Sequence, residues 1–161
     1  MTARAVRLPL RIDNPPLGEL ARLIAAPARW HDHKLGSGGW LICREHVELP
    51  DVAAWPGIVA VARAIPAERT RLWVSLLRAH AAIRSHQDGG RADAVRVHIP
   101  LVGAGVLRIE GTPYAMQVGE AWAVDTVGRP HEATNAGDVD RVHLLVDVHP
   151  NGWLQTHVPW L

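Results

Sequence analysis

Short apolar segments separated by turns fill the second half of this chain, from residue 71 to residue 148. The apolar residues in these segments recur with a period close to two, which is the period of a β-strand. Glycines and prolines lie between the segments, as in a β-sandwich or barrel. The segments expected to be strands are residues 71–77, 95–101, 106–110, 115–118, 120–127 and 141–148. Parallel strands would need long helical crossovers between them, and none fits here, so a double-sheet β core is predicted.

The first 70 residues are expected to support this core with two helices. Apolar residues have helical spacing over residues 17–24 and over residues 58–65, and Pro27 and Pro66 follow the two segments. A glycine-containing turn over residues 36–39 accompanies strands expected around residues 40–43 and 47–49. We therefore expect two N-terminal helices that pack on one sheet.

Length and charge narrow the class of protein further. A chain of 161 residues predicts one domain, with support over residues 1–70 and a β core over residues 71–150. The net charge of +1 and the lack of a Lys/Arg cluster argue against a nucleic-acid partner. Neither a signal-like segment nor an uninterrupted apolar run of about 20 residues is present, so no membrane partner is expected. With Cys43 as the single cysteine, a cytoplasmic protein without intrachain disulfides is expected, and its oligomeric state is left open.

Two of the predicted strands carry polar side chains on one face. Arg96 and His98 alternate with apolar residues in segment 95–101, and Arg141, His143 and Asp147 share a face of segment 141–148. Such a polar face is exposed to solvent in many sheets. It lines a functional interior in others, and both interpretations stay open at this point.

Two histidines and one carboxylate have the pattern of a metal site. His86 and Asp88 are two residues apart, so they project in the same direction from an extended backbone, and His131 follows 45 residues after His86. Two histidines and a carboxylate can occupy one face of an octahedral metal, as in non-haem iron(II) oxygenases. The pattern alone also occurs by chance, so it needs support from other residues.

Arg141, ten residues after His131, supplies such support. A planar guanidinium binds a carboxylate through two hydrogen bonds, which suits the distal carboxylate of 2-oxoglutarate. Ser75 shares a face with Trp73 and could donate its hydroxyl to the same carboxylate. His98 could donate a hydrogen bond to the carboxylate beside the keto group.

From Trp73 to Pro150 the chain resembles the aspartyl/asparaginyl β-hydroxylase-like branch of the 2-oxoglutarate oxygenases, which includes bacterial proline cis-hydroxylases. The matching pieces, in order, are Trp73-Val-Ser, His86-Gln-Asp, Arg96-Val-His-Ile-Pro-Leu, Gly119-Glu-Ala-Trp, Asp125, His131-Glu-Ala-Thr-Asn and Arg141-Val-His-Leu-Leu-Val-Asp. The resemblance implies a double-stranded β-helix of the jelly-roll or cupin type. It also implies Fe(II) at His86, Asp88 and His131, a 2-oxoglutarate site near Ser75, Arg96, His98 and Arg141, and O2 as the second substrate.

Asp88 bears on the substrate. The aspartyl β-hydroxylases proper lack this carboxylate, whereas the proline hydroxylases have it, so the resemblance favours hydroxylation of a free amino acid or related small carboxylate. Hydroxylation of an Asp, Asn or Pro residue in a peptide or carrier-tethered intermediate is the alternative. A cupin-like metal- or carboxylate-binding protein that consumes no O2 is the alternative outside this class.

Residues for substrate contact are less well indicated. Trp40, Arg129 and His143 are the candidates for lining the substrate site. Arg96 and Asn135 could instead be structural partners of the pocket. Asp125 is expected to orient a neighbouring turn or ligand rather than to bind the metal.

Overall fold

The structure is a computed structural model that describes residues 3–25, 31–32, 36–37, 41–45, 54–88 and 93–161. Its elements, in chain order, are β1 (Ala5–Arg11), α1 (Leu17–Ile24), β2 (His31–Asp32), β3 (Gly36–Ser37), β4 (Leu41–Glu45), α2 (Pro56–Arg63), β5 (Arg69–Leu77), β6 (Ala82–His86), β7 (Val95–Val102), β8 (Gly105–Ile109), β9 (Thr112–Met116), β10 (Glu120–Val124), β11 (His131–Thr134), β12 (Arg141–Val148) and α3 (Gly152–His157).

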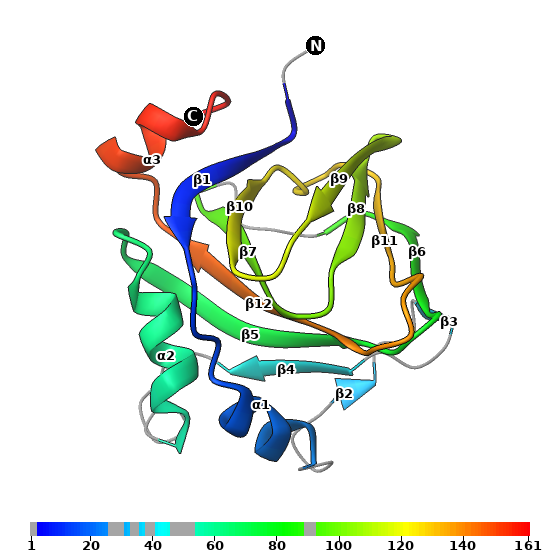
Figure 1. Ribbon diagram of the computed structural model, residues 1–161. Helices are drawn as coiled ribbons and strands as arrows, with labels where there is room; N and C mark the ends of the chain where they lie inside the picture. The colour runs from blue at the N-terminus through cyan, green and yellow to red at the C-terminus, as the bar shows by residue number, and fades with distance from the viewer. Residues whose placement is uncertain (1–2, 26–30, 33–35, 38–40, 46–53, 89–92) are drawn as a thin grey trace.

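The strands form two antiparallel sheets that face each other (Figure 1). The larger sheet has the order β1-β10-β7-β12-β5-β4-β2, and the smaller sheet has the order β3-β6-β11-β8-β9. Strand β12 lies between β7 and β5, which precede it by many residues in the sequence, so the sheet is built by long-range pairing. The predicted mostly β, jelly-roll or cupin-like core is confirmed.

Helices cover the outer face of the larger sheet (Figure 1). Helix α1 lies at the predicted residues, and α2 begins two residues before the predicted segment. Both carboxylate oxygens of Glu19 in α1 accept hydrogen bonds from the first backbone N–H groups of α2, at 2.9 Å and 3.0 Å. The apolar residues that pack between the helices and the sheet include Leu20, Leu23, Ile58, Ala62, Val74, Leu76, Val97, Ile99, Leu144, Val146 and Leu154.

Several elements differ from the sequence prediction. Strand β1 was not predicted, because Pro9 and a register shift between Arg7 and Arg11 break the alternation of its side chains. A proline is tolerated in β1 because β1 is an edge strand. Strands β6 and β11 are short and rich in polar residues, which hides their period. Helix α3 has only six residues, and it is capped by the preceding residue, Asn151, whose side chain accepts from the Leu154 N–H. The strand expected around residues 47–49 lies outside the described residues.

Two strands also end at residues other than those predicted from the sequence. The segment expected at 115–118 is the end of β9, which stops at Met116, and the segment expected at 120–127 ends at Val124. Gly119 separates them with a φ of 83°, and a Cβ there would lie 2.4 Å from the Ile12 carbonyl oxygen. The turn therefore requires glycine at this position.

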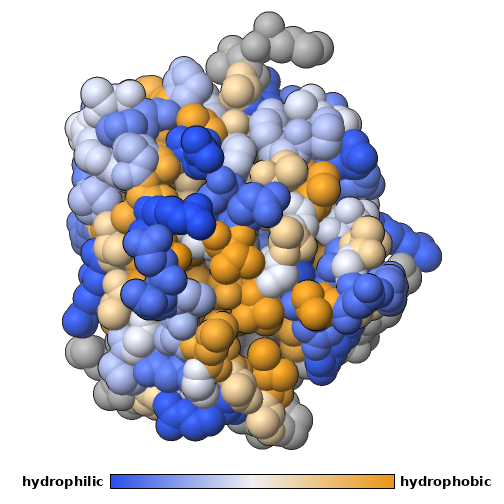
Figure 2. All heavy atoms as spheres, in the orientation of Figure 1, coloured by the Kyte–Doolittle hydropathy of each residue, from blue (hydrophilic) through white to orange (hydrophobic). Residues whose placement is uncertain are grey.

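On the face shown in Figure 2, apolar side chains gather near the centre and hydrophilic side chains surround them. Within the described part of the chain, no helix has the length and apolar character needed to cross a membrane.

Candidate active site

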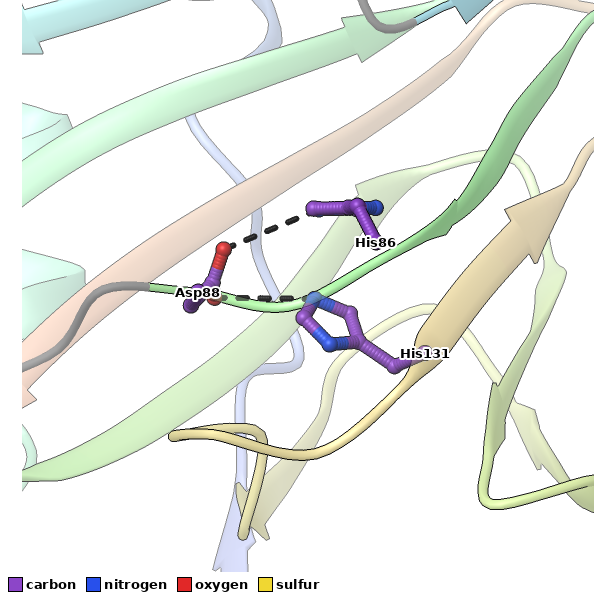
Figure 3. Close-up of side chains that lie close together, drawn as sticks. All are labelled: His86, Asp88 and His131. Carbon is purple, nitrogen blue, oxygen red and sulfur yellow. Dashed lines mark ion pairs between the residues drawn. The ribbon is translucent and has the colours of Figure 1, made fainter.

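His86, Asp88 and His131 converge between two strands of the smaller sheet. His86 ends β6 and His131 begins β11, and the two residues are paired in register. Asp88 lies on the segment after β6, and its carboxylate faces both rings (Figure 3). The distances are 3.6 Å from Oδ1 to His86 Nε2 and 3.5 Å from Oδ2 to His131 Nε2. One ligand atom from each residue lies within 4.8 Å of the others, which is compatible with a common metal ion.

The two imidazoles have the same tautomer. Nδ1 of His86 donates to the Arg84 carbonyl oxygen and Nδ1 of His131 donates to the Arg129 carbonyl oxygen, each at 2.9 Å. A carbonyl only accepts, so each Nδ1 carries a proton, and the Nε2 atom of each ring faces Asp88. Burial is the largest cause that lowers the pKa of His131, which favours its neutral form. Neutral imidazoles oriented in this way by a second hydrogen bond are the common form of metal-ligating histidine.

Asp88 is held by residues from distant parts of the chain. Its Oδ2 accepts from Arg96 Nη1 and from the Thr126 hydroxyl at 3.3 Å, and its backbone forms a parallel bridge with Val127. Arg96 also binds Asp147, so the guanidinium lies between two carboxylates. The sequence offered Arg96 as a cosubstrate ligand or a structural partner, and its contacts among the described residues are those of a structural partner.

The polar face of β7 and β12 lies inside the barrel, not in solvent. His98, Arg141, His143 and Asp147 are all less than 9% exposed. His143 lies opposite Ser75 of β5, and the ring of His98 contacts that of His143 edge to face at 6.0 Å. The residues that the sequence assigned to 2-oxoglutarate therefore lie on adjacent strands of the larger sheet.

Arg141 is a buried cation with no carboxylate partner among the described residues. Its Nε donates to His143 Nε2 at 2.7 Å, and burial lowers its pKa to about 10, so it stays charged at neutral pH. Gly105 leaves the space that the Arg141 side chain occupies, because a Cβ there would lie 2.5 Å from Nε. A buried, unpaired guanidinium is unfavourable unless an anion binds to it, so this end of the pocket fits a carboxylate.

After Arg141, His98 is the second buried residue of this region with a polar group that lacks a partner among the described residues. Its Nδ1 is buried and has no hydrogen-bond partner in the described part of the protein. Burial is the main cause that holds the pKa of both His98 and His143 well below the ordinary value, and the nearby arginines add to it. A polar ligand in the pocket would satisfy the free nitrogen of His98.

The remaining candidates from the sequence have other surroundings. Arg129 donates to Asp125 at 2.8 Å and to Glu110 at 3.2 Å, so its charge is already paired. His143 is 2% exposed and contacts Arg141. Trp40 lies outside the described residues.

Asn135 and Asp125 have structural contacts. The side-chain amide of Asn135 donates to the carbonyl oxygens of Leu77, Arg78 and Val139, which ties the end of β5 to the loop before β12. Asp125 pairs with Arg4 and Arg129, beside the loop that leads to His131. This agrees with the expectation that Asp125 orients a neighbouring turn.

Sequence reasoning missed Thr126, Asp147 and Gly105 as parts of the site. Asp147 shares the face of Arg141 and His143, and this alternation was the signal that could have identified it. Thr126 and Gly105 carry no such signal, because their roles depend on contacts with distant strands.

Residues 28–150 match the sequence profile of the family described as Aspartyl/Asparaginyl beta-hydroxylase. No curated protein sequence matches the chain.

Solved structures with similar folds include a prolyl-4-hydroxylase from Pseudomonas putida, with 18% sequence identity and a TM-score of 0.56. The match covers 84% of this chain and 85% of that chain. An oxidoreductase of the 2OG-Fe(II) oxygenase family from Burkholderia pseudomallei has 19% identity, coverage of 91% and 85%, and a TM-score of 0.54. A cupin-like protein from Thermotoga maritima has 13% identity, coverage of 74% and 75%, and a TM-score of 0.50. At these identities the likeness establishes the fold alone.

Proposed function

The chain belongs to the aspartyl/asparaginyl β-hydroxylase family, and on this premise we propose that it is an Fe(II)- and 2-oxoglutarate-dependent dioxygenase that hydroxylates a free amino acid or related small carboxylate. The observation that carries the proposal is the convergence of His86, Asp88 and His131, with ligand atoms within 4.8 Å of one another. Both Nε2 atoms are available to a metal because both Nδ1 atoms donate to the backbone.

These three side chains would hold the iron on one face and leave its other positions open to the cosubstrate and O2. When bound, iron and 2-oxoglutarate supply the oxidising chemistry, and succinate and CO2 are released. Arg141 would bind the distal carboxylate of 2-oxoglutarate, with the Ser75 hydroxyl as a second donor. His98 would donate to the carboxylate beside the keto group through Nδ1, which has no hydrogen-bond partner among the described residues.

Apolar side chains of both sheets lie next to these residues, because Leu77 is the register partner of Arg141 and Ile109 is the register partner of His131. Leu77, Ile83, Leu107, Ile109 and Met116 pack together between the sheets and are at most 9% exposed. A dry lining strengthens the pairing between Arg141 and a carboxylate and keeps water from the reacting groups.

The substrate class rests on Asp88, the carboxylate that the chain shares with the proline hydroxylases it resembles. Succinate release is the test, with Fe(II), O2 and 2-oxoglutarate supplied and the twenty amino acids and short peptides screened as substrates. Stimulation by a free amino acid supports the proposal, and stimulation by peptides alone contradicts the substrate class. Failure to release succinate under any of these conditions, together with failure to bind Fe(II), contradicts the assignment as a dioxygenase.

A further inference from the structure

We propose that Arg96, fixed by Asp147, is a positioning residue that commits Asp88 to bind the metal through Oδ1 alone. This inference rests on the proposed function, because it takes the His86, Asp88 and His131 cluster as the metal site. The sequence suggested two roles for Arg96, contact with the cosubstrate or structural support of the pocket, and the inference gives the second of these a specific function.

The contacts of Arg96 use three sides of its guanidinium. Its Nε donates to Asp147 Oδ1 at 2.9 Å and its Nη2 donates to Asp147 Oδ2 at 3.2 Å, which is a two-point pairing with one carboxylate. Its Nη1 donates to Asp88 Oδ2. Its Cζ lies 4.6 Å from the centre of the Trp73 ring, so one face is covered as well.

The strand pairing fixes this arrangement. Asp147 of β12 is the register partner of Arg96 in β7, and both side chains point into the barrel. The side chains of Arg96 and Asp147 are 14% and 10% exposed, so water screens their interaction weakly. Arg96 thus extends from a rigid strand pair to the segment that carries Asp88.

Arg96 binds one carboxylate oxygen of Asp88, so the other oxygen is the one available to a metal. Oδ2 accepts from both Arg96 and Thr126, whereas Oδ1 has no hydrogen-bond donor among the described residues. Oδ1 therefore keeps its lone pairs for a metal, beside His86 Nε2 at 3.6 Å. Binding through one oxygen leaves more of the metal's positions open than binding through two.

Asp147 also compensates the positive charge of Arg96. If Arg96 had Asp88 as its sole partner, the guanidinium would cancel the negative charge that attracts a divalent cation. Because Asp147 pairs with Arg96 through two hydrogen bonds, the group of three carries one net negative charge at the metal side. Removal of the Asp147 charge is then expected to weaken metal binding although Asp147 does not touch the metal.

The test uses the full-length, metal-free protein and Mn(II), whose binding is followed by electron paramagnetic resonance. Asp147→Asn keeps the shape of the side chain, and Arg96→Gln removes the guanidinium. Each is expected to weaken Mn(II) binding at least 10-fold, the scale seen when the partner of a metal ligand is removed. The matched control is Glu132→Gln, which removes a half-exposed carboxylate next to His131 and is expected to leave Mn(II) binding unchanged.

A double-mutant cycle separates positioning from general structural support. In an Asp88→Ala background, Asp147→Asn is expected to cause less than a twofold further loss of Mn(II) affinity, because the residue on which it acts is absent. An equal loss in both backgrounds would overturn the proposal. If Arg96→Gln does not fold, Arg96→Lys replaces it in the test. Arg96→Lys is expected to retain part of the Mn(II) affinity, because it keeps the positive charge but loses the two-point pairing with Asp147.

Two further outcomes are decisive. If Mn(II)-saturated Arg96→Gln loses as much 2-oxoglutarate affinity as Arg141→Ala does, Arg96 binds the cosubstrate and the inference is wrong. If the parent protein binds Mn(II) and both variants bind it within twofold of the parent, the inference fails while the proposed function stands. A parent protein that does not bind Mn(II) contradicts the proposed function itself.

Discussion

The Arg141 side chain lies against the backbone of Gly105, the first residue of β8. A Cβ on Gly105 would lie 2.5 Å from Nε and 2.6 Å from Cδ of Arg141, so any other residue at position 105 forces the guanidinium to move. The bond from Arg141 to His143 restrains the same side chain from the other direction. The position of the buried cation therefore depends on a residue with no side chain.

Gly105→Ala is expected to lower 2-oxoglutarate affinity about 10-fold or more, because overpacking that displaces a buried side chain costs about 1–3 kcal/mol. Metal affinity should stay within threefold of the parent, since the His86 side of the pocket is untouched. Anaerobic titration of the Fe(II) protein with 2-oxoglutarate, followed by charge-transfer absorbance, measures both effects. Gly18→Ala, where a Cβ would meet nothing within 4 Å, is the control. Unchanged 2-oxoglutarate affinity in Gly105→Ala would mean that Arg141 does not bind the cosubstrate from this position.

Arg141→Ala is expected to lower 2-oxoglutarate affinity by 10²–10³-fold or more, since an unpaired buried carboxylate costs about 3–5 kcal/mol. Arg141→Lys should lose less, because it keeps the charge without the two-point geometry. The same absorbance titration measures both variants, and Arg108→Ala on the exposed face of β8 is the control. A 2-oxoglutarate affinity within threefold of the parent in Arg141→Ala would assign this role to another residue.

Substitutions of the three metal-site residues are expected to have effects of different size. His86→Ala and His131→Ala are each expected to abolish the Fe(II)–2-oxoglutarate absorbance, because each removes a neutral Nε2 ligand. Asp88→Ala is expected to lower hydroxylation at least 10-fold, since loss of even a ligand's partner has effects of that size. Gln87→Ala changes an exposed residue between two of the ligands and should behave as the parent. Near-parental turnover in Asp88→Ala with metal bound would show that two histidines suffice, and it would favour a peptide substrate.

Burial of two neutral histidines predicts how stability depends on pH. His98 and His143 have pKa values well below the ordinary value in the folded protein, chiefly because of burial. Below about pH 6.5 the unfolded chain binds protons that the folded chain does not. The free energy of unfolding should therefore fall as pH decreases below 6.5, with a slope that approaches about 1.4 kcal/mol per pH unit for each histidine.

Urea denaturation at pH 7.5, 6.5 and 5.5 measures this dependence on the metal-free protein. His143→Asn should reduce the loss of stability between pH 6.5 and 5.5, because one of the buried histidines with a lowered pKa is gone. His149→Gln, which changes a histidine outside the barrel, should retain the full loss. An identical pH dependence in His143→Asn and the parent would contradict the assignment of this effect to the buried histidines.

The spacing of His86, Asp88 and His131 predicted the metal cluster only together with Arg141 and the family resemblance, because the pattern alone also occurs by chance. The alternation of β7 and β12 likewise predicted which side chains share a face. It could not decide between solvent and an interior, since that depends on the smaller sheet, whose strands β6 and β11 are too short and polar to be recognised.

The partners of Arg96 were beyond prediction for a related reason. Asp147 lies 51 residues from Arg96, and their pairing depends on the register of β7 against β12, which includes a shift between Val142 and His143. A change of register by one residue would place Asp147 on the opposite face. Residue types and local periods contain no information about that register.

Four charged side chains form ion pairs beside the loop that leads to His131. Arg4 and Arg129 both pair with Asp125 and Glu110, at distances between 2.8 Å and 3.2 Å, so the four side chains form a closed ring of alternating charge. The ring ties the N-terminal residues before β1 to Arg129, whose carbonyl oxygen orients the His131 ring. The Arg4 side chain is 28% exposed, so each of its ion pairs contributes less than about 1 kcal/mol.

Arg4→Ala is expected to lower the free energy of unfolding by about 1 kcal/mol at low ionic strength, because it breaks two ion pairs and leaves the backbone bonds of residue 4 intact. The difference from the parent should shrink in 1 M NaCl, where the Debye length is about 3 Å. Urea denaturation at low and high salt measures both quantities, and Arg11→Ala, whose Asp13 partner is largely exposed, should cost less. If the ring holds Arg129 in place, Arg4→Ala also weakens metal binding slightly through His131, and this loss should likewise diminish in high salt. A stability loss that is independent of salt would mean that Arg4 acts through packing of its aliphatic stem and not through its charge.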